Sequence, residues 1–233
     1  MNGDTIAWTH ADVLDFDEAV MHARRRGVPA LMALDFQQRA ARLTAIAAYL
    51  NERKEALYAL SRHTGATRAD SWIDIEGGTG TLYAYAGMGG NELPSGNLLH
   101  EGPAIPLGKK GKFAGTHILV PRGGVAVHIN AFNFPIWGLL EKFAPAFLAA
   151  MPCIAKPATA TSYLTHAVVR MMMDSGLVPE GSLQLVIGST GDLLDRLGGF
   201  DAVTPKLDTR ASSLAISPLM RARSLKSRKC GLM

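Results

Sequence analysis

The chain has 233 residues, of which 48% are hydrophobic, 19% are charged and 7% are aromatic. This length can bury a hydrophobic core as one large or two small domains, and the composition is that of a globular protein. The formal net charge of +4 comes from 24 basic and 20 acidic residues. Residues 205–233 hold seven of these basic residues and one acidic residue, so this segment carries +6 and the first 204 residues carry −2. A basic tail on an acidic body does not predict a specific nucleic-acid partner.

Neither a membrane span nor an export signal is expected. The N-terminus shows no basic region followed by an apolar run. The longest apolar run, residues 143–155, contains two prolines and is shorter than the roughly 20 residues that cross a bilayer. Cys153 and Cys230 lie far apart, and the seven histidines have no metal-ligand spacing. We therefore expect a cytoplasmic protein with no disulfide framework and no bound metal.

The first half of the chain has helical periodicity. Asp35 and Gln38 have the spacing of a capping box, and a helix is predicted from this point to a terminator at Gly65. Its buried face is predicted to consist of Leu43, Ile46, Ala47 and Leu50.

A second helix is predicted from Ala69 to Leu82, interrupted by a glycine cluster at residues 77, 78 and 80. No strand precedes this cluster and its spacing is not that of a phosphate-binding loop, so it favours close contact between helices. Residues 92–115 are rich in proline and glycine and are expected to form a loop.

From residue 116 the pattern alternates between short apolar strands and helices. Strands are predicted at residues 118–121, 125–129, 153–155, 183–187 and 201–204, with helices at 137–150, 161–175 and 191–197. Such alternation predicts an α/β fold with a partial Rossmann-type parallel sheet, preceded by an N-terminal helical lead-in. We expect a helical region over residues 1–115, a partial dinucleotide-binding domain over 116–204, and a disordered or non-homologous basic tail over 205–233.

Three polar loops are predicted at the carboxyl ends of these strands, where open parallel sheets bind their ligands. They are residues 130–135, 156–159 and 188–191. The amide of Asn133 and the cation of Lys156 would suit an oxyanion and a nucleotide cofactor. Alternatively, Asn133 could cap the following helix and Lys156 could be a solvated strand-end residue. His128 lies on an apolar strand and is expected in the core rather than in catalysis.

These motifs resemble a known family. The sequences Asn-x-x-Asn-Phe-Pro at 130–135, Lys-Pro-Ala at 156–158 and Gly-Leu-Val-Pro-Glu-Gly at 176–181 are similar to the cofactor-binding half of the aldehyde dehydrogenase superfamily. Residues 64–78, 125–135 and 174–181 resemble, within it, the N-terminal semialdehyde dehydrogenase domain of bifunctional phenylacetic acid degradation proteins. Semialdehyde dehydrogenases of the benzoyl-CoA pathway are a closely similar group. The resemblance covers roughly residues 10–204.

The resemblance implies NAD(P)-dependent oxidation of a CoA-thioester semialdehyde in aromatic catabolism, by a homo-oligomer. Asn133 matches the family's oxyanion-stabilising asparagine, and Lys156 matches the lysine that binds the adenosine ribose. Thr159 stands where many NAD-using relatives carry glutamate, which would repel a 2′-phosphate, so NADP is expected to be used at least as readily as NAD. The remaining cofactor-binding positions implied are Ala131, Phe132, Ala158, Gly188 and Ser189.

The sequence departs from the family pattern after Thr204. The family continues with Phe-Thr-Gly-Ser, whereas this chain reads Pro-Lys-Leu-Asp at 205–208. The family's later segments supply a glutamate base and a nucleophilic cysteine. Cys153 lies in a predicted buried strand and Cys230 has no family context. We therefore expect a truncated or frameshifted, inactive chain, or alternatively a non-catalytic fragment that holds part of a dinucleotide or associates with intact subunits.

Overall fold

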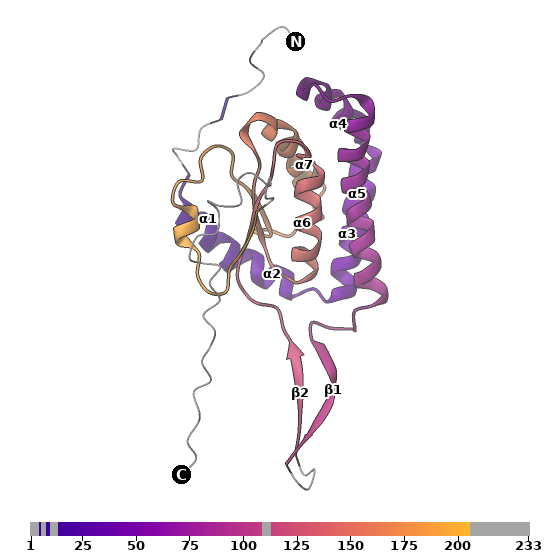
Figure 1. The fold of residues 1–233 in the computed structure, drawn as a ribbon, viewed down its shortest axis with the longest axis vertical. Helices are drawn as coiled ribbons and strands as arrows, with labels where there is room; N and C mark the ends of the chain where they lie inside the picture. Colours follow the sequence, from indigo (N-terminus) through magenta and orange to yellow (C-terminus); the bar gives the residue numbers. More distant parts are fainter. Residues whose placement is uncertain (1–4, 6–7, 10–13, 109–112, 206–233) are drawn as a thin grey trace.

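A computed structural model describes residues 5, 8–9, 14–108 and 113–205 of the chain. It contains a parallel sheet with helices on both faces, which confirms the predicted α/β fold (Figure 1). The tail predicted from residue 205, including Cys230, lies outside the described residues from residue 206 on. The domain boundaries expected from the sequence stay predictions.

The N-terminal region is helical. It comprises α1 (Phe16–His22), the π-helix η1 (Ala23–Gly27), α2 (Val28–Met32), α3 (Phe36–Glu52), α4 (Lys54–Ser61), the 3₁₀ turn η2 (Arg62–Thr64) and α5 (Arg68–Asn91). The capping box of Asp35 and Gln38 is confirmed at the start of α3. All four apolar residues predicted for its inner face are buried. The single helix expected to reach Gly65 is instead divided at Arg53, where the backbone leaves helical geometry.

The glycines of α5 do not interrupt it, contrary to expectation, because the helix runs from Arg68 to Asn91. Gly77 and Gly78 lie against α6 (Trp137–Leu148). A Cβ atom added at Gly77 would lie 2.9 Å from the Trp137 ring. The predicted role in close helix contact is therefore confirmed for Gly77 and Gly78 but not for Gly80, where an added Cβ atom would meet nothing within 4 Å.

The prediction of a loop over residues 92–115 is wrong for residues 99–107 and 113–115, which belong to an antiparallel hairpin. Strand β1 (Leu99–Leu107) pairs with β2 (Phe113–Leu119), and the hairpin projects from the body of the molecule (Figure 1). The strand predicted at 118–121 overlaps only the end of β2, which lies in this hairpin and not in the main sheet. Pro103 and Pro106, which indicated a loop, both lie in β1. A two-stranded ribbon leaves one edge of each strand unpaired, so it tolerates residues that lack an N–H donor.

The main sheet has the strand order β5-β4-β3-β6, and all three pairings are parallel. Its strands are β3 (Ala126–Ile129), β4 (Cys153–Lys156), β5 (Leu183–Leu185) and β6 (Ala202–Pro205). Between them run α6, the 3₁₀ turn η3 (Thr159–Thr161), α7 (Ser162–Asp174) and the 3₁₀ turn η4 (Leu193–Arg196). The four strands predicted for the sheet are confirmed to within a few residues.

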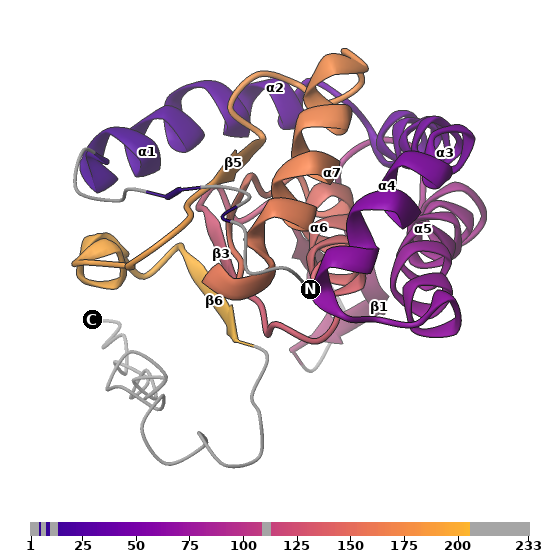
Figure 2. The same cartoon turned by 90° about the horizontal axis from the view of Figure 1, so that it is seen from above.

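Both faces of the sheet are covered, which explains its nearly continuous apolar strands. On one face Val127 and Ile154 pack with Phe16 and Val20 of α1. On the other face, α6 and α7 lie over the sheet, and α3 and α5 pack outside them (Figure 2). Across the described ranges, no helix combines the length and apolar character needed to span a bilayer.

Candidate functional site

The connectivity of the sheet locates the site. The chain passes from β3 to β4 to β5 on one side, then returns to place β6 on the other side of β3. The order of strands therefore reverses at β3. In open α/β sheets ligands bind outside the carboxyl end of the strands at such a reversal. The segment leaving β3, residues 130–136, is called the Asn133 loop below.

The side chain of Asn133 is exposed and makes no hydrogen bond to any described residue. The helix-capping alternative is excluded, because α6 begins at Trp137 without a cap from its own loop. Its first amides donate instead to the carboxylate of Asp74 on α5, at 3.1 Å from the nitrogen of Ile136 and 2.8 Å from that of Trp137. The amide of Asn133 is consequently available to a ligand.

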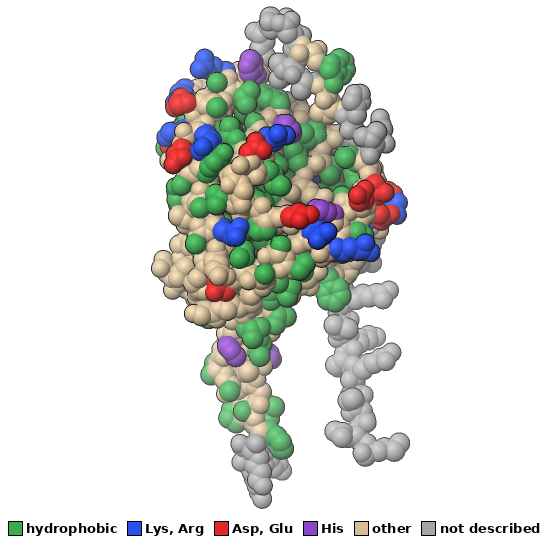
Figure 3. Space-filling model, turned by 180° about the vertical axis from the view of Figure 1, so that it is seen from behind, with side chains coloured by type: hydrophobic (Ala, Val, Ile, Leu, Met, Phe, Trp, Pro, Cys, Tyr) green, Lys and Arg blue, Asp and Glu red, His purple; other side chains and the backbone are tan. Residues whose placement is uncertain are grey.

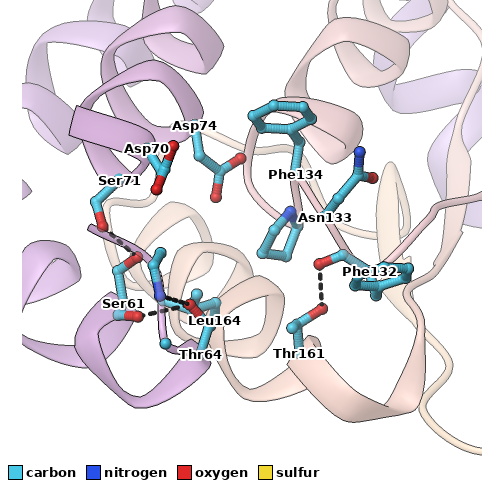
Figure 4. A pocket seen from close by; sticks show the side chains of 13 residues that line it. Ser61, Thr64, Asp70, Ser71, Asp74, Phe132, Asn133, Phe134, Thr161 and Leu164 are labelled. Atoms are coloured by element: carbon cyan, nitrogen blue, oxygen red, sulfur yellow. Dashed lines mark hydrogen bonds between the residues drawn. The ribbon is translucent and has the colours of Figure 1, made fainter. Parts of the chain in front are cut away.

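A hollow of about 380 Å³ separates the Asn133 loop from the α4–α5 corner. One side of its wall is polar, and the other side is formed by the Asn133 loop. The lining residues labelled in Figure 4 are Ser61, Thr64, Asp70, Ser71, Asp74, Phe132, Asn133, Phe134, Thr161 and Leu164. The same view shows the amide of Asn133 directed away from the carboxylates of Asp70 and Asp74. The two acids therefore stand behind the loop rather than beside its exposed amide.

Lys156 ends β4, the strand next to β3. Its half-buried ammonium donates to the carbonyl oxygen of Pro157 at 3.1 Å, and burial lowers its pKa. Ala158 is half-buried and Thr159 is exposed in the turn that follows. The cation of Lys156 and the hydroxyl of Thr159, which has no hydrogen-bond partner among the described residues, therefore lie at the same end of the sheet as Asn133.

The third predicted loop follows β5. Gly188 has a φ of 106°, a left-handed conformation that favours glycine. Ser189 is exposed, and its Oγ accepts from the N–H of Gly191 at 3.1 Å. Because β5 is the neighbour of β4, this loop extends the same rim, although the Ser189 hydroxyl already takes part in its own turn. The cofactor-binding roles of Ala131, Phe132, Lys156, Ala158, Thr159, Gly188 and Ser189 stay predictions.

Polar groups also lie beneath the rim, on the α6 side of β3. His128 is buried, as predicted, and its Nε2 lies 3.2 Å from the Sγ of Cys153. Burial lowers the pKa of His128 to about 4, with the charge of Lys142 as a second cause. Burial raises the pKa of the Cys153 thiol, so this sulfur is held protonated. The described residues contain no group of three or more metal-ligating side chains.

Two residues beside the loop were missed by sequence reasoning. Asp74 ties α5 to the start of α6, and the Thr161 hydroxyl donates to the carbonyl oxygen of Phe132 at 3.0 Å. A signal for Asp74 existed: it shares the helical face of Ser71, Ile75 and Gly78, all buried, and a carboxylate on a buried face needs a partner. No local pattern distinguished Thr161 from its neighbouring threonines.

Comparisons with known proteins identify the family and the fold. The sequence model of the aldehyde dehydrogenase family matches residues 1–204. The 3,4-dehydroadipyl-CoA semialdehyde dehydrogenase of Aromatoleum evansii is 40% identical over 229 residues, covering 97% of this chain and 44% of that protein. The N-succinylglutamate 5-semialdehyde dehydrogenase of Burkholderia multivorans is 32% identical over 192 residues, covering 79% and 36%. The chain thus spans less than half the length of these curated relatives.

Solved structures share the fold. The NAD-dependent benzaldehyde dehydrogenase of Corynebacterium glutamicum superposes with a TM-score of 0.76 over 94% of this chain and 47% of its own, at 23% identity. The betaine aldehyde dehydrogenase of Staphylococcus aureus in complex with NAD+ gives a TM-score of 0.65 over 77% of this chain and 35% of its own, at 25% identity. With the family model matched over most of its length, this chain belongs to the aldehyde dehydrogenase family.

Proposed function

We propose that this chain supplies the cofactor-binding edge and the oxyanion-stabilising amide of an NAD(P)-dependent dehydrogenase that oxidises a CoA-linked semialdehyde to its acid in aromatic catabolism. The observation that carries the proposal is the exposed, unpaired amide of Asn133 at the strand-order reversal, one strand from the half-buried cation of Lys156. The 40% identity to a CoA-semialdehyde dehydrogenase supports the substrate class.

The residues at the sheet edge fit a dinucleotide. Lys156 would hold the adenosine ribose, while the neutral Thr159 leaves room for a 2′-phosphate that a carboxylate would repel. The backbone of Ala131 and Phe132, with Ala158, Gly188 and Ser189, would complete the rim. NADP is therefore proposed to serve at least as well as NAD, and the bound cofactor supplies the hydride acceptor.

Asn133 would act where negative charge develops. When a thiolate attacks the aldehyde carbon, the carbonyl oxygen becomes an oxyanion, and the amide N–H of Asn133 would donate a hydrogen bond to it. Removing one such donor typically raises the barrier by about 2.7–4 kcal/mol. Among the described residues the thiolate has no source. Cys153 is fully buried with a raised pKa, so the nucleophile must come from outside them.

The same observation favours a second candidate, a non-catalytic chain that binds part of a dinucleotide or associates with intact subunits. Formation of NADPH from NADP+ and a CoA-linked semialdehyde by the purified chain separates the two candidates. Turnover by the wild-type chain that is lost in Asn133→Ala supports the dehydrogenase proposal. Binding of NADPH without turnover supports the second candidate.

Cofactor binding is tested directly by NADPH fluorescence titration. Lys156→Ala should weaken binding of both dinucleotides, and Thr159→Glu should weaken NADPH binding while preserving or improving NADH binding. Thr44→Val on α3, remote from the sheet edge, is the control. Equal NADPH and NADH affinities in wild type and Thr159→Glu would rule out the proposed role of this position.

Assembly into a homo-oligomer is also part of the proposal, and the projecting hairpin supports it. Hydrophobic side chains lie on the surface of the projecting hairpin (Figure 3). Ile105, Leu107 and Phe113 are among the exposed ones, with Phe113 at 74%. An isolated two-stranded ribbon has marginal stability in water, and exposed apolar side chains on it suit a protein interface.

A cytoplasmic location is proposed too, supported by the free thiol of Cys153.

A further inference from the structure

Asn133 stands on a loop with little regular backbone hydrogen bonding of its own. The loop is joined to β4 by the N–H of Asn130, which donates to the carbonyl oxygen of Lys156 at 2.9 Å. Its other end leads into α6. Ordering a segment of this kind costs about 1–2 kcal/mol per residue in backbone entropy. A donor that must meet an oxyanion has to be held before the reaction, since catalysis of this type depends on preorganisation.

Side chains from three other elements hold this loop. The hydroxyl of Thr161, in η3, donates to the carbonyl oxygen of Phe132 at 3.0 Å. The hydroxyl of Thr165, in α7, donates to the carbonyl oxygen of Pro135 at 3.0 Å. The carboxylate of Asp74, in α5, accepts from the amides of Ile136 and Trp137. These ties bracket Asn133, one immediately before it and two just after it.

The three side chains that hold the loop differ from ordinary surface contacts in their burial and in the atoms they bind. Asp74, Thr161 and Thr165 are all buried, with exposures of 4%, 8% and 0%. Each binds backbone atoms, so the ties fix the path of the loop whatever side chains it carries. Asp74 also places a negative charge at the N-terminus of α6, where the helix dipole favours it. The Asp74 carboxylate on α5 thereby caps α6, a helix distant from it in the sequence.

We propose that Asp74, Thr161 and Thr165 are positioning residues that hold the Asn133 loop so that its amide is aimed at the reacting oxygen. The inference rests on the proposed function of Asn133. None of the three touches the reacting atoms, and their effect is transmitted through the loop backbone. The core of α6 does not depend on them, because Leu139, Leu140, Phe143 and Phe147 are fully buried in the main hydrophobic cluster.

Isosteric variants test the proposal. Thr161→Val and Thr165→Val remove one hydroxyl each and keep the shape, whereas Thr161→Ser restores a hydroxyl. Thr44→Val is the matched control, since its hydroxyl donates to the carbonyl oxygen of Ala40 on a remote helix. Hydrogen exchange of residues 130–137 should be about tenfold faster in the two threonine-to-valine variants at the site and close to wild type in Thr161→Ser and Thr44→Val.

The amide of Asn133 provides a spectroscopic signature that a merely structural role would not move. The chain contains six asparagines, so selective ¹⁵N-asparagine labelling gives a simple side-chain spectrum, and Asn133→Ala assigns its signal. This signal should shift in Thr161→Val and return in Thr161→Ser. In turnover, the kcat of Thr161→Val should fall about tenfold, a larger change than that in its KM for NADP+.

Loop exchange within about twofold of wild type in both valine variants, or an unmoved Asn133 signal, would overturn the proposal. A kcat equal to that of Thr44→Val would do the same. If the wild-type chain forms no NADPH, the enzyme proposal fails while exchange and the Asn133 signal still decide whether the ties hold the loop. If Thr165→Val does not fold, the Thr161 pair of variants decides alone.

Discussion

The buried imidazole of His128 gives the folded chain a pH-dependent stability that follows from its surroundings. The side chain is 2% exposed on β3, and its folded pKa is lowered to about 4 from the ordinary 6.5, first by burial and then by the charge of Lys142. The unfolded chain regains the ordinary value. Between pH 6.5 and about 4 the unfolded state therefore binds more protons, and stability falls as the pH is lowered.

The magnitude follows from the difference between the two pKa values. A difference of about 2.5 units at about 1.36 kcal/mol per unit corresponds to roughly 3 kcal/mol. This contribution is fully present above the unfolded pKa of 6.5 and is lost by the time the pH reaches about 4. It is a large part of the roughly 5–15 kcal/mol by which native domains are stable.

Urea unfolding of wild type and His128→Gln at matched pH values measures this contribution. Glutamine does not ionise in this range, and the carboxylates with lowered pKa, Glu55, Asp70 and Glu76, are common to both proteins. The stability of wild type relative to His128→Gln should fall by about 2–3 kcal/mol between pH 7 and pH 4.5. Parallel stability curves for the two proteins would refute the assignment of the titration to His128.

Four further outcomes are expected. Arg39→Met, which removes a fully buried guanidinium that donates to the ends of α2 and α6, should cost about 3–5 kcal/mol in urea unfolding, and a loss under 1 kcal/mol would contradict this. Phe113→Ser should reduce the molar mass measured by light scattering if the hairpin holds the oligomer; an unchanged mass would exclude that. Gly87→Ala, with open space around the new Cβ, should stabilise by about 1 kcal/mol. Gly27→Ala should lower the melting temperature, because its Cβ would clash with the carbonyl oxygen of Gly181, and a melting temperature equal to wild type would contradict the packing.

Local signals were enough to predict the sheet and the start of α3. The apolar run ending at Ile129 and the capping box at Asp35 both act over a few residues, and the structure confirms them. The hairpin was missed because proline and glycine indicate loops in general, whereas a ribbon with free strand edges accepts them. The helix break at Arg53 has no proline or glycine to mark it.

The site shows the same division between local and distant information. Asn133 and Lys156 were visible because Asn133 lies in the loop after one apolar strand and Lys156 ends the next. The helical face of Asp74 indicated that it is buried but not what it binds, since its partners, Ile136 and Trp137, are 62 and 63 residues away. Its importance comes from tertiary packing of α5 on α6, which no window of neighbouring residues contains.

The link between Asp74 and the start of α6 also sets an order of events during folding. Contacts between residues far apart in sequence form only after the intervening chain has paid its loop-closure entropy, so they follow local structure. The loop of Asn133 can be fixed only once α5 has docked on α6 and α7 has brought Thr165 into place. The orientation of a single amide thus depends on the docking of helices that are distant in the sequence, and it reports whether α5, α6 and α7 have come together.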